Sequence, residues 1–157
     1  MRQQQIEITL KGKASRAYTA QPKVGVVIVP VTRERQNDFA ASALKGRLLP
    51  CPACDQGTHQ EPLRGTWCYF YDKFARYWRT GNPEYSVFVE GNNKLPFWAF
   101  SSLPAFGCPG AGDCLNWCYS FKAWRYPSAF FRQLQNALLL QGEEGRQHIA
   151  DRWAKLP

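Results

Sequence analysis

Three cysteines within eleven residues form the densest group of reactive side chains in this sequence. Cys108, Cys114 and Cys118 lie in a stretch whose glycines and proline predict a compact turn. We expect Asp113 to cap a helix, so that Cys114 and Cys118 share one helical face and Cys108 points toward the positive end of that helix. Three thiolates suit a metal ion or an iron–sulfur cluster with one open coordination position. The alternative is small buried cysteines or a single disulfide.

A second group begins with the pair Cys51-Pro-Ala-Cys54 and continues with His59 and Cys68. Cysteines separated by two residues let both thiolates bind one ion, and a histidine with a third thiolate completes a tetrahedral set. We therefore predict a zinc site here. Two alternatives stay open: His59 is an ordinary loop histidine beside unligated thiols, or cysteines of both groups form one mixed site.

Composition limits the functional class. The 157 residues fit one folded domain, and 45% of them are hydrophobic. Twenty Lys and Arg residues against twelve Asp and Glu give a net charge of +8, which favours an anionic partner such as nucleic acid. The N-terminal residues do not resemble a signal peptide, and no apolar run is long enough to cross a membrane. We expect a cytoplasmic protein, in which clustered cysteines bind metal more often than they form disulfides.

Aromatic and basic side chains alternate in two stretches and predict a surface for single-stranded nucleic acid, on which bases stack between cations. The alternative for the rings is core packing. We expect at least Lys122 and Arg125 to be accessible and to form a positive patch with Arg132. The candidate rings are Tyr69, Tyr71, Trp78, Trp124 and Tyr126, and the candidate cations are Lys73, Arg76, Arg79, Lys122, Arg125 and Arg132.

Hydrophobic periodicity predicts an α+β fold: a small N-terminal β-sheet, a middle pinned by cysteines and a helical C-terminal third. Residues 1–90 form a β-containing region with the Cys-x2-Cys loop, residues 91–157 form the cysteine turn and helices, and we expect one compact unit. The predicted strands are 5–11, 23–31 and 85–90. The predicted helices are 35–45 (capped by Asn37 or Asp38), 69–79, 113–123, 128–142 and 144–155.

Residues 91–142 resemble a block of the phage and plasmid family called gene product eighty-eight. The resemblance is carried by Asn93-Lys-Leu-Pro, Ser102-Leu-Pro-Ala, the cysteine turn, Cys118-Tyr119, Lys122, Arg125-Tyr-Pro and Asn136. It implies an origin in a mobile element. Fuller members continue with a further strand, so the resemblance covers part of a larger fold.

The cysteine block is also similar to the cluster loop of radical S-adenosylmethionine enzymes, although its spacing is Cys-x5-Cys-x3-Cys where those enzymes have Cys-x3-Cys-x2-Cys. That similarity implies a [4Fe–4S] cluster and S-adenosylmethionine as cofactors. Three functional hypotheses follow from the sequence: a cluster-dependent protein, a zinc-stabilised protein that binds single-stranded nucleic acid, and a regulator of mobile-element origin that binds a host protein. The sequence has no Gly-x-Ser-x-Gly motif and no Walker loop, which argues against serine hydrolases and P-loop enzymes.

Overall fold

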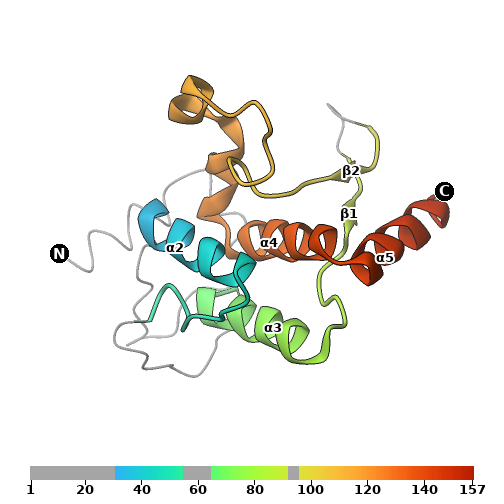
Figure 1. Cartoon of the computed structure of the whole chain (residues 1–157), viewed down its shortest axis with the longest axis horizontal. Coiled ribbons are helices and arrows are strands. Elements are labelled where there is room, and N and C mark those ends of the chain that lie inside the picture. Colours follow the sequence, from blue (N-terminus) through green and yellow to red (C-terminus); the bar gives the residue numbers. More distant parts are fainter. Residues whose placement is uncertain (1–30, 55–64, 92–95) are drawn as a thin grey trace.

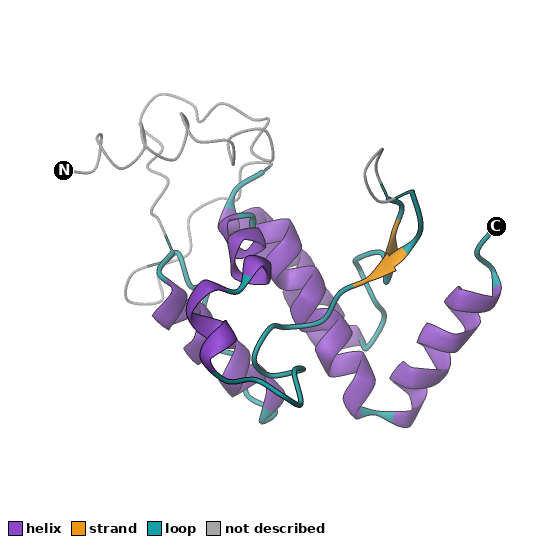
Figure 2. Cartoon of the chain, turned by 90° about the horizontal axis from the view of Figure 1, so that it is seen from above, coloured by secondary structure: helices purple, strands orange, loops and turns teal. Residues whose placement is uncertain are grey.

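A computed structural model describes residues 31–54, 65–91 and 96–157. A small two-stranded antiparallel sheet lies at one side of the helices, near α5, and this mixture of helices and strands confirms the α+β class (Figure 1 and Figure 2). The α-helices are α2 (Arg33–Leu44), α3 (Trp67–Thr80), α4 (Pro127–Gln141) and α5 (Glu143–Ala154). The other elements are the strands β1 (Phe88–Val89) and β2 (Ala99–Phe100) and the 3-10 helices η3 (Asp113–Trp117) and η4 (Tyr119–Arg125).

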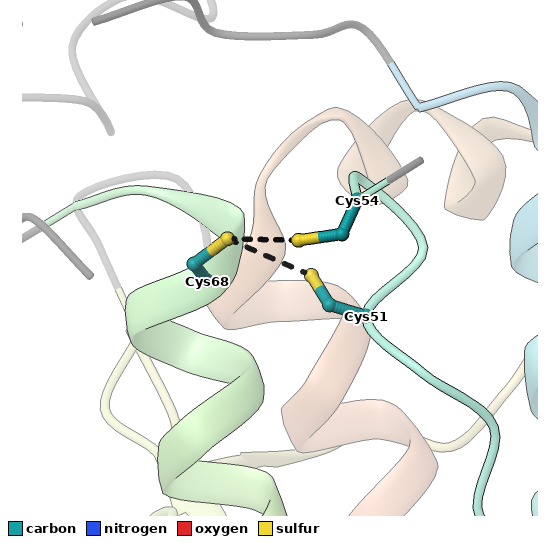
Figure 3. Close-up of side chains that lie close together, drawn as sticks. All are labelled: Cys51, Cys54 and Cys68. Atoms are coloured by element: carbon teal, nitrogen blue, oxygen red, sulfur yellow. Dashed lines mark hydrogen bonds between the residues drawn. The ribbon is translucent and has the colours of Figure 1, made fainter. Parts of the chain in front are cut away.

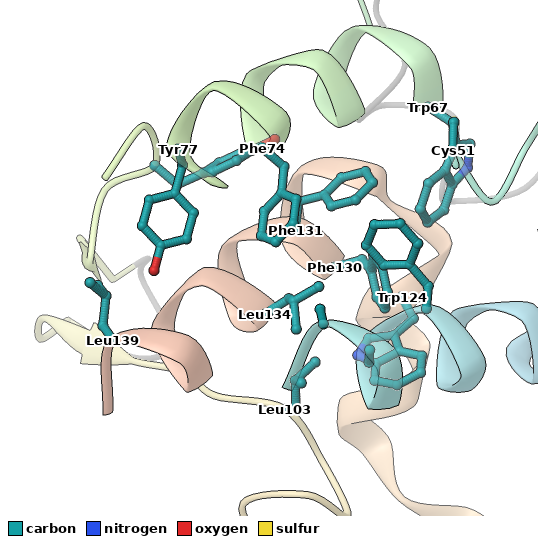
Figure 4. Packing of buried hydrophobic residues seen from close by; sticks show 14 of the residues in the cluster. Cys51, Trp67, Phe74, Tyr77, Leu103, Trp124, Phe130, Phe131, Leu134 and Leu139 are labelled. Atoms are coloured by element: carbon teal, nitrogen blue, oxygen red, sulfur yellow. The ribbon is translucent and has the colours of Figure 1, made fainter. Parts of the chain in front are cut away.

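Helices α2 and α3 both run in the same direction as α4. At the start of α2, the Gln36 amide donates to the Trp124 carbonyl just before α4, and at the other end Gln141 of α4 donates to the last carbonyl of α2. The first ring of α3, Trp67, lies 5.6 Å from Phe130 in the first turn of α4. Figure 4 places Tyr77 at the opposite end of α3 from Trp67. The N-terminal ends of all three helices therefore lie at one end of the molecule.

The core consists mainly of aromatic rings from these helices (Figure 4). Phe39 of α2 packs edge-to-face on Phe74 of α3 and on Phe131 of α4, with centroids 6.0 and 5.8 Å apart. The spacing of apolar residues in 69–79 predicted this helix correctly, because Phe74 and Tyr77 face the core. The β-prone residues from Trp67 to Tyr71 would also be compatible with a strand, and the structure excludes that alternative because they form the start of α3.

Local caps moved two predicted boundaries. The side chain of Thr32 accepts a hydrogen bond from the Arg35 amide and caps α2, so the predicted cap at Asn37 or Asp38 was wrong. Pro127 is the first residue of α4, a position at which proline loses no helical hydrogen bond. Helix α5 follows α4 after Gly142, close to the predicted range.

In the described residues, the sheet has two strands and lies in the middle of the chain. In the predicted strand 85–90, only Phe88 and Val89 pair, and they pair with Ala99 and Phe100, which the sequence did not indicate. The Phe88 ring lies 5.8 Å from Phe100 and 5.6 Å from Trp153 of α5, so α5 covers one side of this hairpin. The predicted strands 5–11 and 23–31 fall, except for Val31, outside the described residues. In the described ranges, no helix is long and apolar enough to cross a membrane.

Buried amides of α4 hold the segment that leads into β1. The Gln135 side-chain oxygen accepts hydrogen bonds from the amides of Glu84 and Tyr85, both at 2.9 Å, and its nitrogen donates to the Tyr85 carbonyl at 3.0 Å. The next residue, Asn136, donates to the carbonyls of Val87 and Ser101. Two adjacent side chains of α4 therefore supply hydrogen-bond partners to backbone groups next to β1 and β2 that do not pair within the sheet.

We expect Gln135→Ala to lower the free energy of unfolding by about 2–4 kcal/mol, because it leaves three backbone groups without partners in a buried place. Urea unfolding measures this change. The control is Gln147→Ala, which removes an exposed hydrogen bond to Asp151 and should cost at most about 0.5 kcal/mol. If both variants lost the same unfolding free energy, the hydrogen bonds of Gln135 to Glu84 and Tyr85 would not be what stabilises this segment.

Candidate metal centre

The thiols of Cys51, Cys54 and Cys68 meet at one point (Figure 3). The Sγ atom of Cys68 lies 4.0 Å from that of Cys51 and 3.3 Å from that of Cys54, and all three sulfur atoms are within 4.8 Å of one another. A disulfide requires sulfur atoms about 2.05 Å apart, so the three residues are thiols. Two thiolates bound tetrahedrally to one zinc ion at about 2.3 Å lie about 3.8 Å apart. The observed spacing therefore suits a single ion.

Short-range structure places these three sulfur atoms. The Cys54 amide donates to the Cys51 carbonyl at 3.0 Å, which closes a tight turn and directs both side chains to the same side. Cys68 is the second residue of α3, and the helix start is fixed because the Thr66 hydroxyl accepts a hydrogen bond from the Tyr69 amide. A turn and a capped helix end thus present the three ligands.

Two hydrogen bonds hold the turn against the helices. The Tyr71 hydroxyl of α3 donates to the Leu49 carbonyl at 2.9 Å, and the Arg35 guanidinium of α2 donates to the Pro52 carbonyl at 3.1 Å. Residues 45–54 therefore run back from the end of α2 toward the start of α3. Cys51 is almost completely buried beside Trp67, as Figure 4 shows.

The surroundings of the centre are electropositive. Cys68 lies in the first turn of α3, where the helix dipole favours negative charge, and α2 and α4 begin at the same end of the molecule. The Arg35 guanidinium is bound to the residue after Cys51. Without a metal, the hydrogen bond to the Cys68 thiol and then burial raise the pKa of the Cys51 thiol. A bound cation reverses that preference, because a coordinating thiol is deprotonated.

The fourth ligand predicted from the sequence, His59, lies outside the described residues. In the part of the chain that the structure describes, the group contains three cysteines and no histidine, aspartate or glutamate. It also contains none of the later cysteines, so a single mixed site is not formed there.

The structure does not bring the other three cysteines together. Cys108 and Cys114 are exposed, Cys118 is half-buried, and within the described ranges their sulfur atoms form no group compact enough for one ion. The predicted single helix over 113–123 forms as two 3-10 helices instead, because η3 ends before Cys118 and η4 begins after it. Cys118 itself has an extended backbone (φ −58°, ψ 124°), so it does not share a helical face with Cys114. The predicted cap at Asp113 was wrong, because Gly112 precedes η3 and no side chain caps it.

The fold buries some residues of the predicted nucleic-acid surface and exposes others. Trp124 is a core residue: it is 2% exposed, and its indole nitrogen donates to the Gln133 side chain at 2.9 Å. Tyr126 is half-buried directly before α4. The expected accessibility of Lys122 and Arg125 is confirmed. Four of the candidate cations are exposed: Arg76, Arg79, Lys122 and Arg125.

Three of the candidate cations surround one tyrosine between α3 and α4. The Lys73 ammonium lies 4.6 Å from the centre of the Tyr85 ring, and Arg76 pairs with Glu84 at 3.5 Å. Burial lowers the pKa of Arg132 and raises that of Tyr85, whose hydroxyl faces the positive potential of both arginines. This cluster is partly neutralised and partly buried, so it packs α3 against α4.

The sequence missed two rings that the fold displays to solvent. Trp117 and Tyr119 are 77% and 81% exposed and flank Cys118. One signal was present: the stretch from Gly110 to Asn116, directly before these rings, is rich in small and polar residues.

No protein-family model, curated protein or solved structure matches this chain. The resemblance of residues 91–142 to the gene product eighty-eight family therefore stays a prediction, and the functional argument depends on the geometry of the side chains.

Proposed function

We propose that this protein binds zinc through Cys51, Cys54 and Cys68, with His59 as the fourth ligand, and that the ion fastens the connection after α2 to the start of α3. The observation that carries the proposal is the convergence of three thiols within 4.8 Å at a helix N-terminus. A closed four-ligand site of this kind serves the fold, because it leaves no position for a substrate.

Zinc fits this centre better than a [4Fe–4S] cluster does. Each cysteine of a [4Fe–4S] cluster binds a different iron atom, so its thiolates stand farther apart than two ligands of one ion. The separations of 3.3 and 4.0 Å agree with shared coordination of a single ion. Thiolates combined with an imidazole are ligands that select zinc among the common divalent metals.

Metal analysis of the purified chain tests the proposal. We expect one zinc ion per chain in a colourless protein, and we expect Cys68→Ser to lose most of that zinc. Cys114→Ser is the matched control, because it removes an exposed thiol outside the group and should keep the zinc. Zinc retained by Cys68→Ser, or a brown protein whose iron depends on Cys68, would overturn the zinc assignment.

A second candidate function is an iron–sulfur cluster on Cys108, Cys114 and Cys118. One observation favours it: none of the five side chains of η3 is fully buried, and Leu115 alone of them packs partly against the core, so hydrophobic packing holds this segment only weakly. A cluster would join the segment through three thiolates and leave one iron open for a cofactor such as S-adenosylmethionine. The cluster requires the three thiols to rearrange around it.

Anaerobic reconstitution with iron and sulfide tests this second candidate. We expect a brown protein with visible absorption that Cys114→Ser abolishes and Cys68→Ser preserves, because the two groups occupy separate places. Absence of colour after reconstitution, or colour that survives Cys114→Ser, would rule out the cluster while leaving the zinc proposal intact.

A further inference from the structure

The segment from residue 105 to residue 126, here called the aromatic lobe, contains both buried and exposed large rings. Phe106 is 43% exposed and Tyr126 is half-buried. Phe121 and Trp124 are buried and contact each other edge-to-face with centroids 4.9 Å apart, and Trp124 continues into the core through Phe130 at 5.0 Å. Trp117 and Tyr119 are left almost fully in solvent. In Figure 1 the first part of this lobe, including η3, stands apart from the three packed helices.

The buried rings fix the position of the helix η4, which carries Tyr119 and directly follows Trp117 and Cys118. The Trp124 indole donates to Gln133, and the Trp124 carbonyl accepts a hydrogen bond from Gln36 at 2.6 Å, so η4 is attached to both α4 and α2. Tyr119 is the first residue of η4 and is therefore carried by an anchored element. Burying two large rings stabilises a fold by several kcal/mol, whereas exposing two others contributes nothing to it. The exposed pair is available for a partner.

Positive charge accompanies the exposed rings. The Lys122 ammonium lies 5.4 Å from the centre of the Tyr119 ring, and Lys122 is exposed. The Arg33 guanidinium of α2 lies 4.3 Å from the centre of the ring of Phe121, which belongs to η4 like Tyr119 and Lys122. Asp113 is the acidic residue of the lobe, and the whole chain carries +8. A flat, negatively charged ligand matches this arrangement.

We propose that the aromatic lobe binds single-stranded nucleic acid, with bases stacked on Trp117 and Tyr119 and a phosphate at Lys122. Single-stranded nucleic acid is favoured over a protein partner by the neighbours of the rings. Apart from the two rings, the exposed side chains within four positions of Trp117 are small or polar (Asp113, Cys114 and Asn116), and Leu115 is partly buried against the core. A stable protein interface needs an apolar centre inside about 800 Å² per partner. A base needs one ring face and a nearby cation, and both are present.

Fluorescence anisotropy with a labelled oligothymidylate of about 15 nucleotides tests the proposal on the full chain. We expect Trp117→Ala and Tyr119→Ala each to weaken binding by about 5- to 150-fold. Trp117→Leu should weaken it similarly, because leucine keeps an apolar side chain but offers no ring to stack on. We expect Lys122→Ala to reduce the slope of log affinity against log salt by about one.

The matched control is Trp153→Ala, which removes another exposed tryptophan ring (63% exposed) that lies on α5 and outside the aromatic lobe. This variant should leave the affinity for the oligonucleotide unchanged. Circular dichroism and zinc content, measured on every variant, separate a loss of binding from a loss of fold or of the metal centre. Absence of oligonucleotide binding, or binding that both ring variants retain, would overturn the proposal. Self-association that Trp117→Ala abolishes, in a chain that does not bind the oligonucleotide, would assign the rings to a protein interface instead.

Discussion

Zinc should raise the melting temperature of the metal-free chain by about 8–16 °C when free zinc is about a thousand times its dissociation constant. Binding to the folded state alone contributes about 4 kcal/mol at that ratio. A chain of 157 residues gains about 2–4 °C for each kcal/mol. The physical reason is that three thiols meet only in the folded chain, where residues 51–54 lie against the start of α3. Differential scanning calorimetry with a zinc titration measures the shift.

Two variants make this prediction specific. Cys51→Ser removes a buried ligand and should abolish the response to zinc, whereas Cys114→Ser should keep it, because Cys114 lies outside the converging thiols. A full zinc response in Cys51→Ser would contradict the site. Loss of the response in Cys114→Ser would instead point to a site that recruits both cysteine groups.

Trp124→Ala should lower the free energy of unfolding by about 4–6 kcal/mol, which is a large part of the stability of an ordinary domain. Truncation of a buried tryptophan to alanine costs about 3–5 kcal/mol, and the Gln133 oxygen loses its donor as well. The packing of η4 against α4 depends on this residue, since its ring contacts Phe121 within η4 and Phe130 of α4. Denaturant unfolding followed by circular dichroism measures the loss.

Comparison with other tryptophan variants identifies the cause. Trp124→Phe keeps most of the ring volume but lacks the N–H, so its loss should be intermediate. Trp153→Ala removes an exposed ring that contacts Phe88 and should cost less than about 1.5 kcal/mol. A loss of unfolding free energy below about 1 kcal/mol in Trp124→Ala would be close to the effect of a surface substitution. It would mean that η4 does not depend on this residue.

The helices were predictable because their signals are local. Apolar residues at helical spacing fix the buried face of α3, and Pro127 and Gly142 mark the ends of α4. The start of α2 was misplaced because Asn37 and Asp38 have the same capping chemistry as Thr32. The pairing of β1 with β2 joins residues that are ten and twelve positions apart and is set by tertiary contacts. The sequence indicated a strand at 85–90 but not its partner at 99–100.

For the candidate sites, cysteine spacing determined which residues are suited to metal, and Cys51, Cys54 and Cys68 were all identified from sequence. Only the tertiary structure decided between the two groups. The long-range return of the chain from α2 to α3 brings Cys68 to the turn, whereas the short segment around Cys118 forms two separate 3-10 helices. The same holds for the rings: composition marks Trp117, Tyr119 and Trp124 alike, and packing against α4 decides which of them is buried.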